Sequence, residues 1–246
     1  MTKRSLIFIL LLFSFAAFAS DGPERFAPAL LRHGGDYEVR KNALPDLMIE
    51  LMARTSVNAY MKVKTLNIMD ADLFSYPLIF MSGTKSFPAF SNSERDRLRR
   101  YLEAGGMLVI DDASGRTGSG FDESVRREMA ALFPYNPLIN LNVDHAVFRS
   151  FFLLRKPFFA GRVLISPKLE GVVLESHTPI IFSKNDAAGS WERDRGGRYI
   201  NDCLPGGELQ RQEGFKFGIN SIMYAMTLDY KKDAAHMKAL MNRRGR

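Results

Sequence analysis

Short apolar runs alternate with amphipathic segments through the first half of the chain. Within 43–54 the apolar residues recur with the helical period, which predicts a helix there. The runs at 78–81 and 107–110 are continuously apolar, as is typical of strands buried on both faces of a parallel sheet. Between these two runs, Ser91 and Glu94 have the spacing of a capping box and predict the start of a helix that ends near Gly105.

Weaker patterns complete an alternation of strands and helices. Further strands are expected at 26–31, 57–63, 138–141, 171–174 and 179–182, a short helical turn at 70–74, and helices at 122–132 and 215–228. A polar loop is expected at 185–198 around Trp191. Alternating strands and helices with short connections predict an α/β fold with a doubly wound, mostly parallel sheet and helices on both faces.

The first 19 residues have the pattern of a signal peptide. Lys3 and Arg4 precede an apolar run over 6–18, and Ala17-Phe18-Ala19 fits a cleavage site before Ser20. The alternative is an uncleaved anchor, but a helix of that length spans only about 20 Å of a roughly 30 Å hydrocarbon core. We therefore expect an exported protein, periplasmic or secreted, with no transmembrane span after cleavage and a single domain over 20–230.

The positive charge of the chain is concentrated at its C-terminal end. The formal net charge is +7, and residues 231–246 carry six Lys and Arg side chains against one acidic side chain, Asp233. The domain body is therefore close to neutral, and the charge does not predict a nucleic-acid-binding face. The basic tail over 231–246 is interpreted as a solvated terminus or as a contact for anionic lipid or cell-wall polymer.

Three polar breaks follow predicted strands at the edge where ligands bind in open parallel sheets. They are His33-Gly34-Gly35-Asp36, Ser82-Gly83-Thr84-Lys85 and Asp111-Asp112. We expect a site at the carboxyl ends of the strands, although each break can equally serve as a turn or a cap.

The candidate catalytic residues are Asp36, Thr84, Asp111, Asp112 and His145. Asp111 and Asp112 are also candidate ligands of a hard cation, because carboxylate oxygens suit such ions. Thr84 follows a buried strand, as a nucleophile would, but needs an adjacent base. His145 follows Asp144, and adjacent side chains usually point apart, so a structural role for His145 is the alternative.

Several sites are not indicated by the sequence. The lone cysteine, Cys203, cannot form an internal disulfide. The chain has no His/Cys spacing of a zinc site, no Gly-x-Ser-x-Gly motif, and no phosphate loop or dinucleotide fingerprint. The sequence therefore indicates no particular cofactor.

A set of motifs in order along residues 26–230 resembles the bacterial family called domain of unknown function 4159. The matching stretches are 31–36, 43–47, 72–77, 98–106, Asp111-Asp112, 121–122, 126–129, 133–134, Asp144-His145, 148–152, 217–220 and 224–225. The resemblance implies a class I glutamine amidotransferase-like, flavodoxin-like α/β fold and no assigned activity. Some relatives are segments of larger membrane-linked proteins, which implies an assembly role.

The chain departs from the family pattern at four places. Ser82-Gly83-Thr84-Lys85 stands where the family has Thr-Gly-His-Gly, so a histidine is missing. The aromatic position near Tyr37-Glu38 is altered, the loop after Asp112 is lengthened by 115–120, and the amidotransferase cysteine is absent. A catalytic site built on that histidine would be lost here.

Three functions are compatible with these observations. The first is a non-catalytic binding or assembly protein of the envelope with an envelope protein as partner, which the missing nucleophile and histidine favour. The second is a hydrolase or metal-assisted enzyme that uses Asp36, Asp111, Asp112 and His145. The third is a small-ligand or carbohydrate-binding protein with Trp191 near its cleft.

Overall fold

The computed structural model of the chain describes residues 25–175 and 177–244, with residues 229–244 described by their backbone only. The expected signal peptide over 1–19 lies outside the described residues. In chain order the elements are β1 (Ala29–Leu31), α1 (Ala43–Arg54), β2 (Lys64–Leu66), η1 (Ala71–Ser75), β3 (Leu78–Gly83), α2 (Asn92–Glu103), β4 (Met107–Asp112), α3 (Gly120–Leu132), β5 (Ile139–Asn140), η2 (Ala146–Phe148), β6 (Glu170–Val172), β7 (Ile180–Ser183), α4 (Ala187–Trp191) and α5 (Gly207–Arg244).

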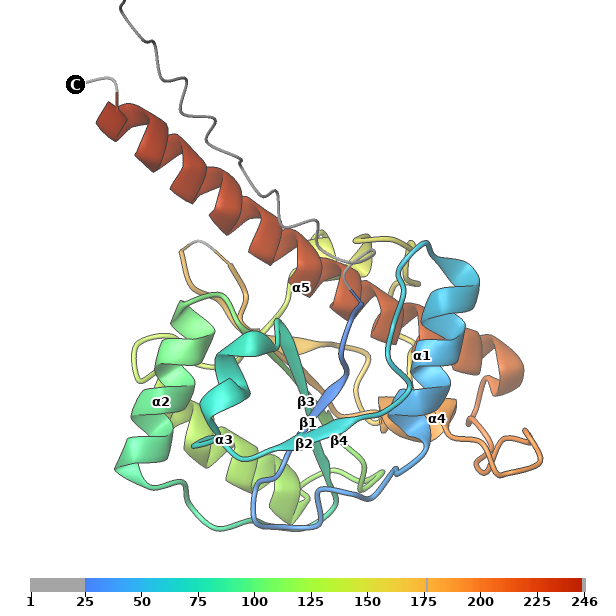
Figure 1. Ribbon diagram of the computed structural model, residues 1–246. Helices are drawn as coiled ribbons and strands as arrows, with labels where there is room; N and C mark the ends of the chain where they lie inside the picture. Colours follow the sequence, from blue (N-terminus) through green and yellow to red (C-terminus); the bar gives the residue numbers. More distant parts are fainter. Residues whose placement is uncertain (1–24, 176, 245–246) are drawn as a thin grey trace, which may run out of the picture.

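One seven-stranded sheet, in the order β2-β1-β3-β4-β7-β6-β5, runs through the centre of the molecule (Figure 1). The first five strands of this order are parallel, and β6 and β5 continue the sheet in antiparallel pairing. Counted by themselves, the parallel strands have the order 2-1-3-4-5, which is that of flavodoxin-like doubly wound sheets. The predicted α/β fold is confirmed, whereas the class I glutamine amidotransferase-like assignment stays a prediction.

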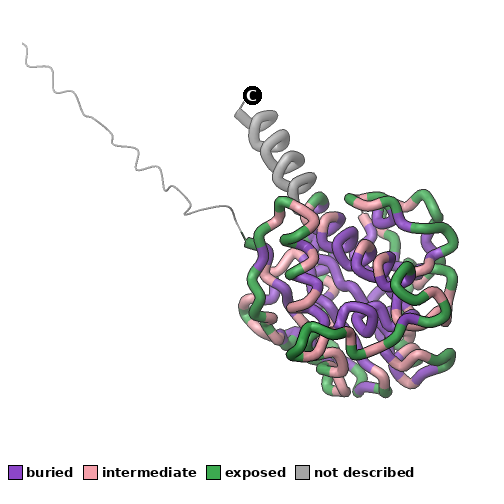
Figure 2. The backbone as a smooth tube through the Cα atoms, turned by 90° about the vertical axis from the view of Figure 1, so that its right-hand side faces the viewer, coloured by how far each residue is buried: buried purple, intermediate pink, exposed green. Residues whose placement is uncertain are grey.

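Helices cover both faces of the sheet, as Figure 1 shows, with α1, α4 and α5 on one face and α2 and α3 on the other. Alternate residues of the central strands serve the two faces: Phe80 and Val109 pack with α1 and α5, while Ile79 and Ile110 pack with α2 and α3. All six residues of β3 and of β4 are buried, which explains their continuously apolar start. Figure 2 shows this buried interior inside a rim of exposed loops and helix faces.

The strongest local signals give the elements they predict. Helix α1 spans the predicted residues, and its apolar stripe packs on the sheet. Helix α2 begins with the predicted capping box, in which the Ser91 hydroxyl accepts the Glu94 N–H and the Glu94 carboxylate accepts the Ser91 N–H at 2.7 Å.

Three predicted segments differ from the structure. The strand expected over 57–63 lies instead at β2, and within 57–63 only Ala59 forms a bridge, to Phe26. The loop expected over 185–198 contains α4, whose five residues are all buried. The helix expected over 215–228 begins at Gly207 and continues to Arg244, so it includes most of the segment interpreted as a tail.

No helix in the described ranges is both long enough and apolar enough to cross a membrane.

Candidate functional site

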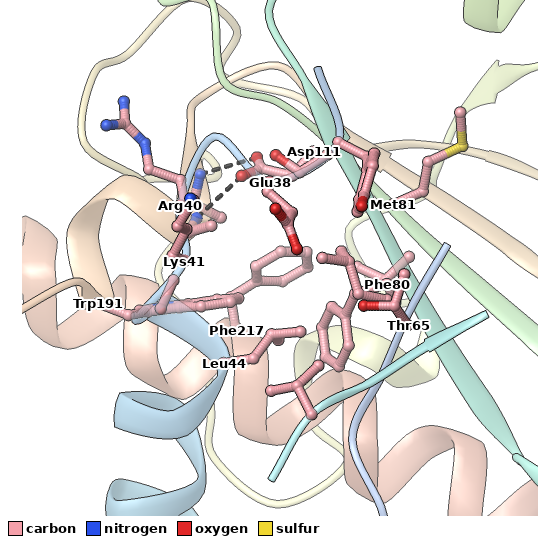
Figure 3. A pocket seen from close by; sticks show the side chains of 18 residues that line it. Glu38, Arg40, Lys41, Leu44, Thr65, Phe80, Met81, Asp111, Trp191 and Phe217 are labelled. Atoms are coloured by element: carbon pink, nitrogen blue, oxygen red, sulfur yellow. Dashed lines mark hydrogen bonds between the residues drawn. The ribbon is translucent and has the colours of Figure 1, made fainter. Parts of the chain in front are cut away.

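A cavity of about 230 Å³ lies at the carboxyl ends of β1, β3 and β4, between the sheet and the helices α1, α4 and α5 (Figure 3). This is the place where the order of the parallel strands reverses, between β1 and β3. In doubly wound sheets the connections leave this switch point in opposite directions, and a crevice opens between them. The location of the cavity therefore follows from the topology of the sheet.

The walls of the cavity are mainly apolar. The strands contribute one row of residues in register, Leu30, Phe80 and Val109, and the helices contribute Leu44, Trp191 and Phe217. The rings of Phe80 and Trp191 meet edge to face, with centroids 6.3 Å apart. The indole of Trp191 packs directly against the backbone of α5. This close approach needs the glycines of α5 at positions 214 and 218, where a Cβ would come within 3.5 Å and 2.8 Å of the indole.

Ser82 and Asp111 form a polar end to this apolar cavity. They are register partners on β3 and β4, two residues beyond Phe80 and Val109, so they share the face that lines the cavity. Ser82 is only 8% exposed, and its Oγ has no hydrogen-bond partner among the described residues. A buried hydroxyl without a partner costs about 1–3 kcal/mol, so this atom is unusual in a folded protein.

The carboxylate of Asp111 joins the central strand to α4. Its Oδ1 accepts the N–H of Ala187 at 2.8 Å and its Oδ2 accepts the N–H of Ala188 at 2.9 Å. Burial, together with the charges of Asp186 and Asp112, raises the pKa of Asp111 to about 7, against the opposing effect of the two backbone bonds. A buried carboxyl that titrates near neutral pH and lines a cavity is a typical mark of a functional site.

An ion cluster fixes the segment that covers the rim of the cavity. Asp186 adopts a left-handed backbone conformation (φ 51°), and its carboxylate accepts hydrogen bonds from the Nε and Nη2 of Arg40, at 3.1 and 2.5 Å. Arg162 donates to the same carboxylate through its Nε. Burial disfavours the charged form of Arg40, but the bonds to Asp186 outweigh it and raise the pKa of Arg40. The loop after β1 is therefore tied to the start of α4.

Figure 3 shows how the polar and apolar groups are separated. The carboxylates of Glu38 and Asp111 lie on the upper side of the cavity, and Leu44, Phe80 and Phe217 lie below them. Glu38 is exposed and takes part in no ion pair within the described part of the chain.

The structure brings Asp36 and Thr84 together, outside the cavity lining. The Asp36 carboxylate accepts the backbone N–H of Thr84 at 3.1 Å and of Lys85 at 3.2 Å, and it also accepts the Thr84 hydroxyl. Burial raises the pKa of Asp36, but these bonds outweigh it and lower the pKa overall. This pair shapes the turn after β3, and both members are engaged in doing so.

Asp112 lies on the opposite face of the sheet from Asp111, because successive strand residues alternate. Its Oδ1 accepts the N–H of Ser114 at 2.9 Å, and its Oδ2 accepts the hydroxyl of Ser119, the N-cap of α3, at 2.5 Å. The two adjacent carboxylates are thus directed into different layers of the molecule. Within the described ranges, no group of three or more His, Cys, Asp or Glu side chains is arranged to hold a metal ion.

The structure separates His145 from the other candidates. Its Nε2 lies 2.9 Å from the hydroxyl of Thr178, which precedes β7, and its Nδ1 accepts the N–H of Val147. Thr178 is five residues before Ser183, the register partner of Asp111, so His145 lies at the amino end of the sheet, roughly 16 Å along the strands. Burial lowers the pKa of His145.

His33 supports the site without lining it. Its Nε2 donates to the carbonyl of Ser82 at 2.9 Å, and its Nδ1 accepts the N–H of Gly35 at 3.3 Å. Burial lowers the pKa of His33 and so favours the neutral ring, although the hydrogen bond to the Ser82 carbonyl acts in the opposite direction. The histidine therefore holds the end of β1 against the end of β3.

A family model described as a domain of unknown function (DUF4159) matches residues 27–226 of the chain. The chain belongs to the DUF4159 family. The matched range contains every residue that lines the cavity of this DUF4159 domain. A search of curated proteins gives no match.

The cavity of this DUF4159 domain lies at the edge of the sheet where a site is predicted, but of the predicted candidates only Asp111 lines it. Ser82, Arg40 and Phe217 line the cavity without being predicted, and Trp191, expected in a polar loop near a cleft, lines it from α4. One signal was available for Ser82: β3, β4 and β7 each change from apolar to polar at the same register position, at Ser82, Asp111 and Ser183.

Replacing Ser82 by Ala should leave the free energy of unfolding unchanged or raise it by up to about 1 kcal/mol, because the hydroxyl has no partner to lose. Ser183→Ala is the matched control in the same row. The Ser183 hydroxyl accepts the N–H of Asn185 at 3.2 Å, and its loss should cost about 1 kcal/mol. Urea unfolding followed by circular dichroism measures both. If Ser82→Ala lowers the free energy of unfolding as much as Ser183→Ala does, the Ser82 hydroxyl stabilises the fold.

The raised pKa of Asp111 predicts a pH dependence of stability. The folded state keeps a proton on Asp111 up to about pH 7, whereas the unfolded chain releases it near 3.8. Stability should therefore fall as the pH rises through this window, by up to about 1.4 kcal/mol per pH unit. Asp111→Asn removes this titration, so the stability of the wild type relative to the variant should decrease between these pH values. A difference that does not change with pH would contradict the assignment.

Proposed function

We propose that this DUF4159 protein is an exported, non-catalytic binding domain of the cell envelope, and that the cavity at the carboxyl ends of β1, β3 and β4 takes a small ligand. The observation that carries the proposal is the Ser82 hydroxyl, which is buried at the polar end of an apolar cavity and has no hydrogen-bond partner among the residues that the structure describes. A ligand that bonds to this hydroxyl removes the cost of leaving it unsatisfied.

The dimensions and lining of the cavity support a small organic ligand. Ligand sites are concave and mostly apolar, with a few polar groups that fix orientation. This cavity, at about 230 Å³, is slightly below the range of about 300–1,000 Å³ that is common for drug-sized ligands. A compact molecule with one polar end fits it best.

The surroundings of Ser82 favour binding over catalysis. A serine nucleophile needs a base within hydrogen-bond reach, and in the described part of the chain the Ser82 hydroxyl has no such partner. The ring of His33 bonds to the Ser82 carbonyl and not to its hydroxyl. His145 is at the other end of the sheet.

A hydrolase is the second candidate, and one observation favours it. Asp111, beside Ser82 in the register, has a pKa of about 7, which suits a general base. A turnover that Ser82→Ala abolishes would support this alternative in place of the binding proposal.

The export part of the proposal is supported by the tripartite pattern of residues 1–19. Expression of the full chain in a bacterium with two membranes should yield a mature protein that begins at Ser20 and fractionates with the periplasm. Intact-mass measurement of the purified protein checks the cleavage. A protein that retains residues 1–19 and pellets with membranes would show an anchor instead. An envelope partner, the other expectation of the first hypothesis, stays a prediction.

A variant that fills the cavity tests the binding proposal. Thr65 lies on β2, is half-buried and lines the cavity, so Thr65→Phe should occupy part of the space with a residue that strands accept well. Ligand-observed NMR against a library of small cationic, neutral and anionic molecules should find binders of the wild type that Thr65→Phe loses. Thr117→Phe, at an exposed loop position outside the cavity, is the control. The absence of any binder sensitive to Thr65→Phe would contradict the proposal.

A further inference from the structure

We propose that the ligand of this cavity carries a primary ammonium group on a compact apolar or aromatic body, and that Ser82, Asp111 and Glu38 receive the ammonium. The inference rests on the proposed function and names its ligand class. The separation of the two carboxylates from the apolar walls in Figure 3 matches the two parts of such a molecule.

The cavity does not suit an anion. The backbone N–H groups of Ala187 and Ala188 at the start of α4 are already bonded to Asp111. The guanidinium of Arg40 is held by the Asp186 carboxylate. An anionic head group beside Asp111 would therefore meet a carboxylate instead of free donors.

A purely apolar ligand is also a poor fit, because it would leave the Ser82 hydroxyl buried and unsatisfied. An ammonium has three donors and no acceptor. It can donate to the Ser82 Oγ and to Asp111, whose two oxygens each retain acceptor capacity after one backbone bond. It thus satisfies the polar end of the cavity with one group.

The charge at the inner end of the cavity favours a cation when Asp111 is ionised. Glu38 and Lys41 are both exposed at the rim, and neither forms an ion pair with a residue in the described ranges. Lys41 offsets Glu38, so the ionised Asp111 leaves an excess negative charge at the inner end. Because Asp111 is buried whereas Lys41 is in solvent, the field at the inner end is dominated by Asp111.

The aromatic walls suit the body of the ligand. Phe80, Trp191 and Phe217 present apolar surface, and aromatic faces also attract a nearby cation. Trp191 is the only tryptophan of the chain, so its fluorescence reports directly on the cavity.

Binding of an ammonium should depend on pH through Asp111. The ionised form attracts the ammonium, so affinity should rise by about tenfold between pH about 6 and about 8. Aliphatic amines titrate near about pH 10 and stay charged over this range. The charged groups on the cavity side of the sheet that surround Asp111 are Asp186, Arg40, Glu38 and Lys41, and Asp112 acts on it from the opposite face.

Three probes with the same body and different head groups test the inference on the full mature protein. They are benzylammonium, benzyl alcohol and benzoate, and binding is followed by Trp191 fluorescence and by calorimetry. We expect benzylammonium to bind with a dissociation constant on the order of 1 mM, because the probe is small. Benzyl alcohol should bind at least about tenfold more weakly, and benzoate should not bind.

Two variants locate the ammonium. Ser82→Ala should weaken benzylammonium binding by about tenfold, and Glu38→Gln by about threefold because Glu38 is exposed. Glu103→Gln is the matched control: it removes the same charge from α2, on the other face of the sheet, and should leave the affinity unchanged. Circular dichroism establishes that each variant is folded.

The outcomes separate the ligand class from the binding function. Benzoate or benzyl alcohol that binds as tightly as benzylammonium, in a manner that Thr65→Phe abolishes, overturns the ammonium inference and leaves the binding function intact. No response to benzylammonium, or a response that is unaffected by Ser82→Ala and Glu38→Gln, also overturns the inference. If, in addition, the library gives no binder sensitive to Thr65→Phe, the proposed function fails as well.

Discussion

The carboxylate of Asp111 is the interaction on which the rest of the site depends. It belongs to the penultimate residue of the central strand β4, and its two oxygens accept the first backbone N–H groups of α4. A helix of five residues cannot stabilise itself, so α4 needs this anchor and the N-cap bond that the Asp186 carboxylate accepts from Gly189. Once α4 is fixed, Trp191 packs against α5 and closes one wall of the cavity. Asp186 in turn receives Arg40 and orients the loop after β1.

Much of the fold could be predicted from the sequence because it rests on local signals. The apolar runs of β3 and β4 and the capping box of α2 each specify their element within a few residues. Prediction was wrong where long-range contacts decide. Residues 185–198, which contain α4, are rich in polar side chains, which is typical of a loop. Asn185 and Asp186 are nevertheless fully buried, because distant backbone and arginine groups satisfy them. That compensation cannot be read from the local pattern.

The candidate site shows the same division. Topology alone predicts a crevice at the carboxyl ends of the strands, and Asp111, a candidate on that basis, lines the cavity there. The sequence could not distinguish Asp111 from Asp112, since the orientation of β4 in the sheet decides which side chain lies on which face. This orientation places Asp111 in the cavity and Asp112 at the N-cap of α3. Nor could the sequence favour Ser82 over Thr84 as a cavity residue, because that choice depends on tertiary contacts. The Thr84 hydroxyl donates to Asp36, whereas the Ser82 hydroxyl has no partner in the described part of the chain.

The electrostatics of this switch point are the reverse of those found in many doubly wound sheets. Such sheets commonly bind a phosphate at a helix N-terminus, where free N–H groups and the helix dipole favour an anion. In this chain Asp111 occupies the first N–H groups of α4, the helix that follows β7, so above a pH of about 7 the protein itself supplies the anion. An external anion gains little there and meets a buried carboxylate. Because Asp111 takes the place of an external anion, the inner end of the apolar cavity presents hydrogen-bond acceptors. The ligand group that these acceptors favour is therefore a donor. The single carboxylate of Asp111, near the end of β4, thus both holds α4 in place and sets the sign of charge that the cavity can receive.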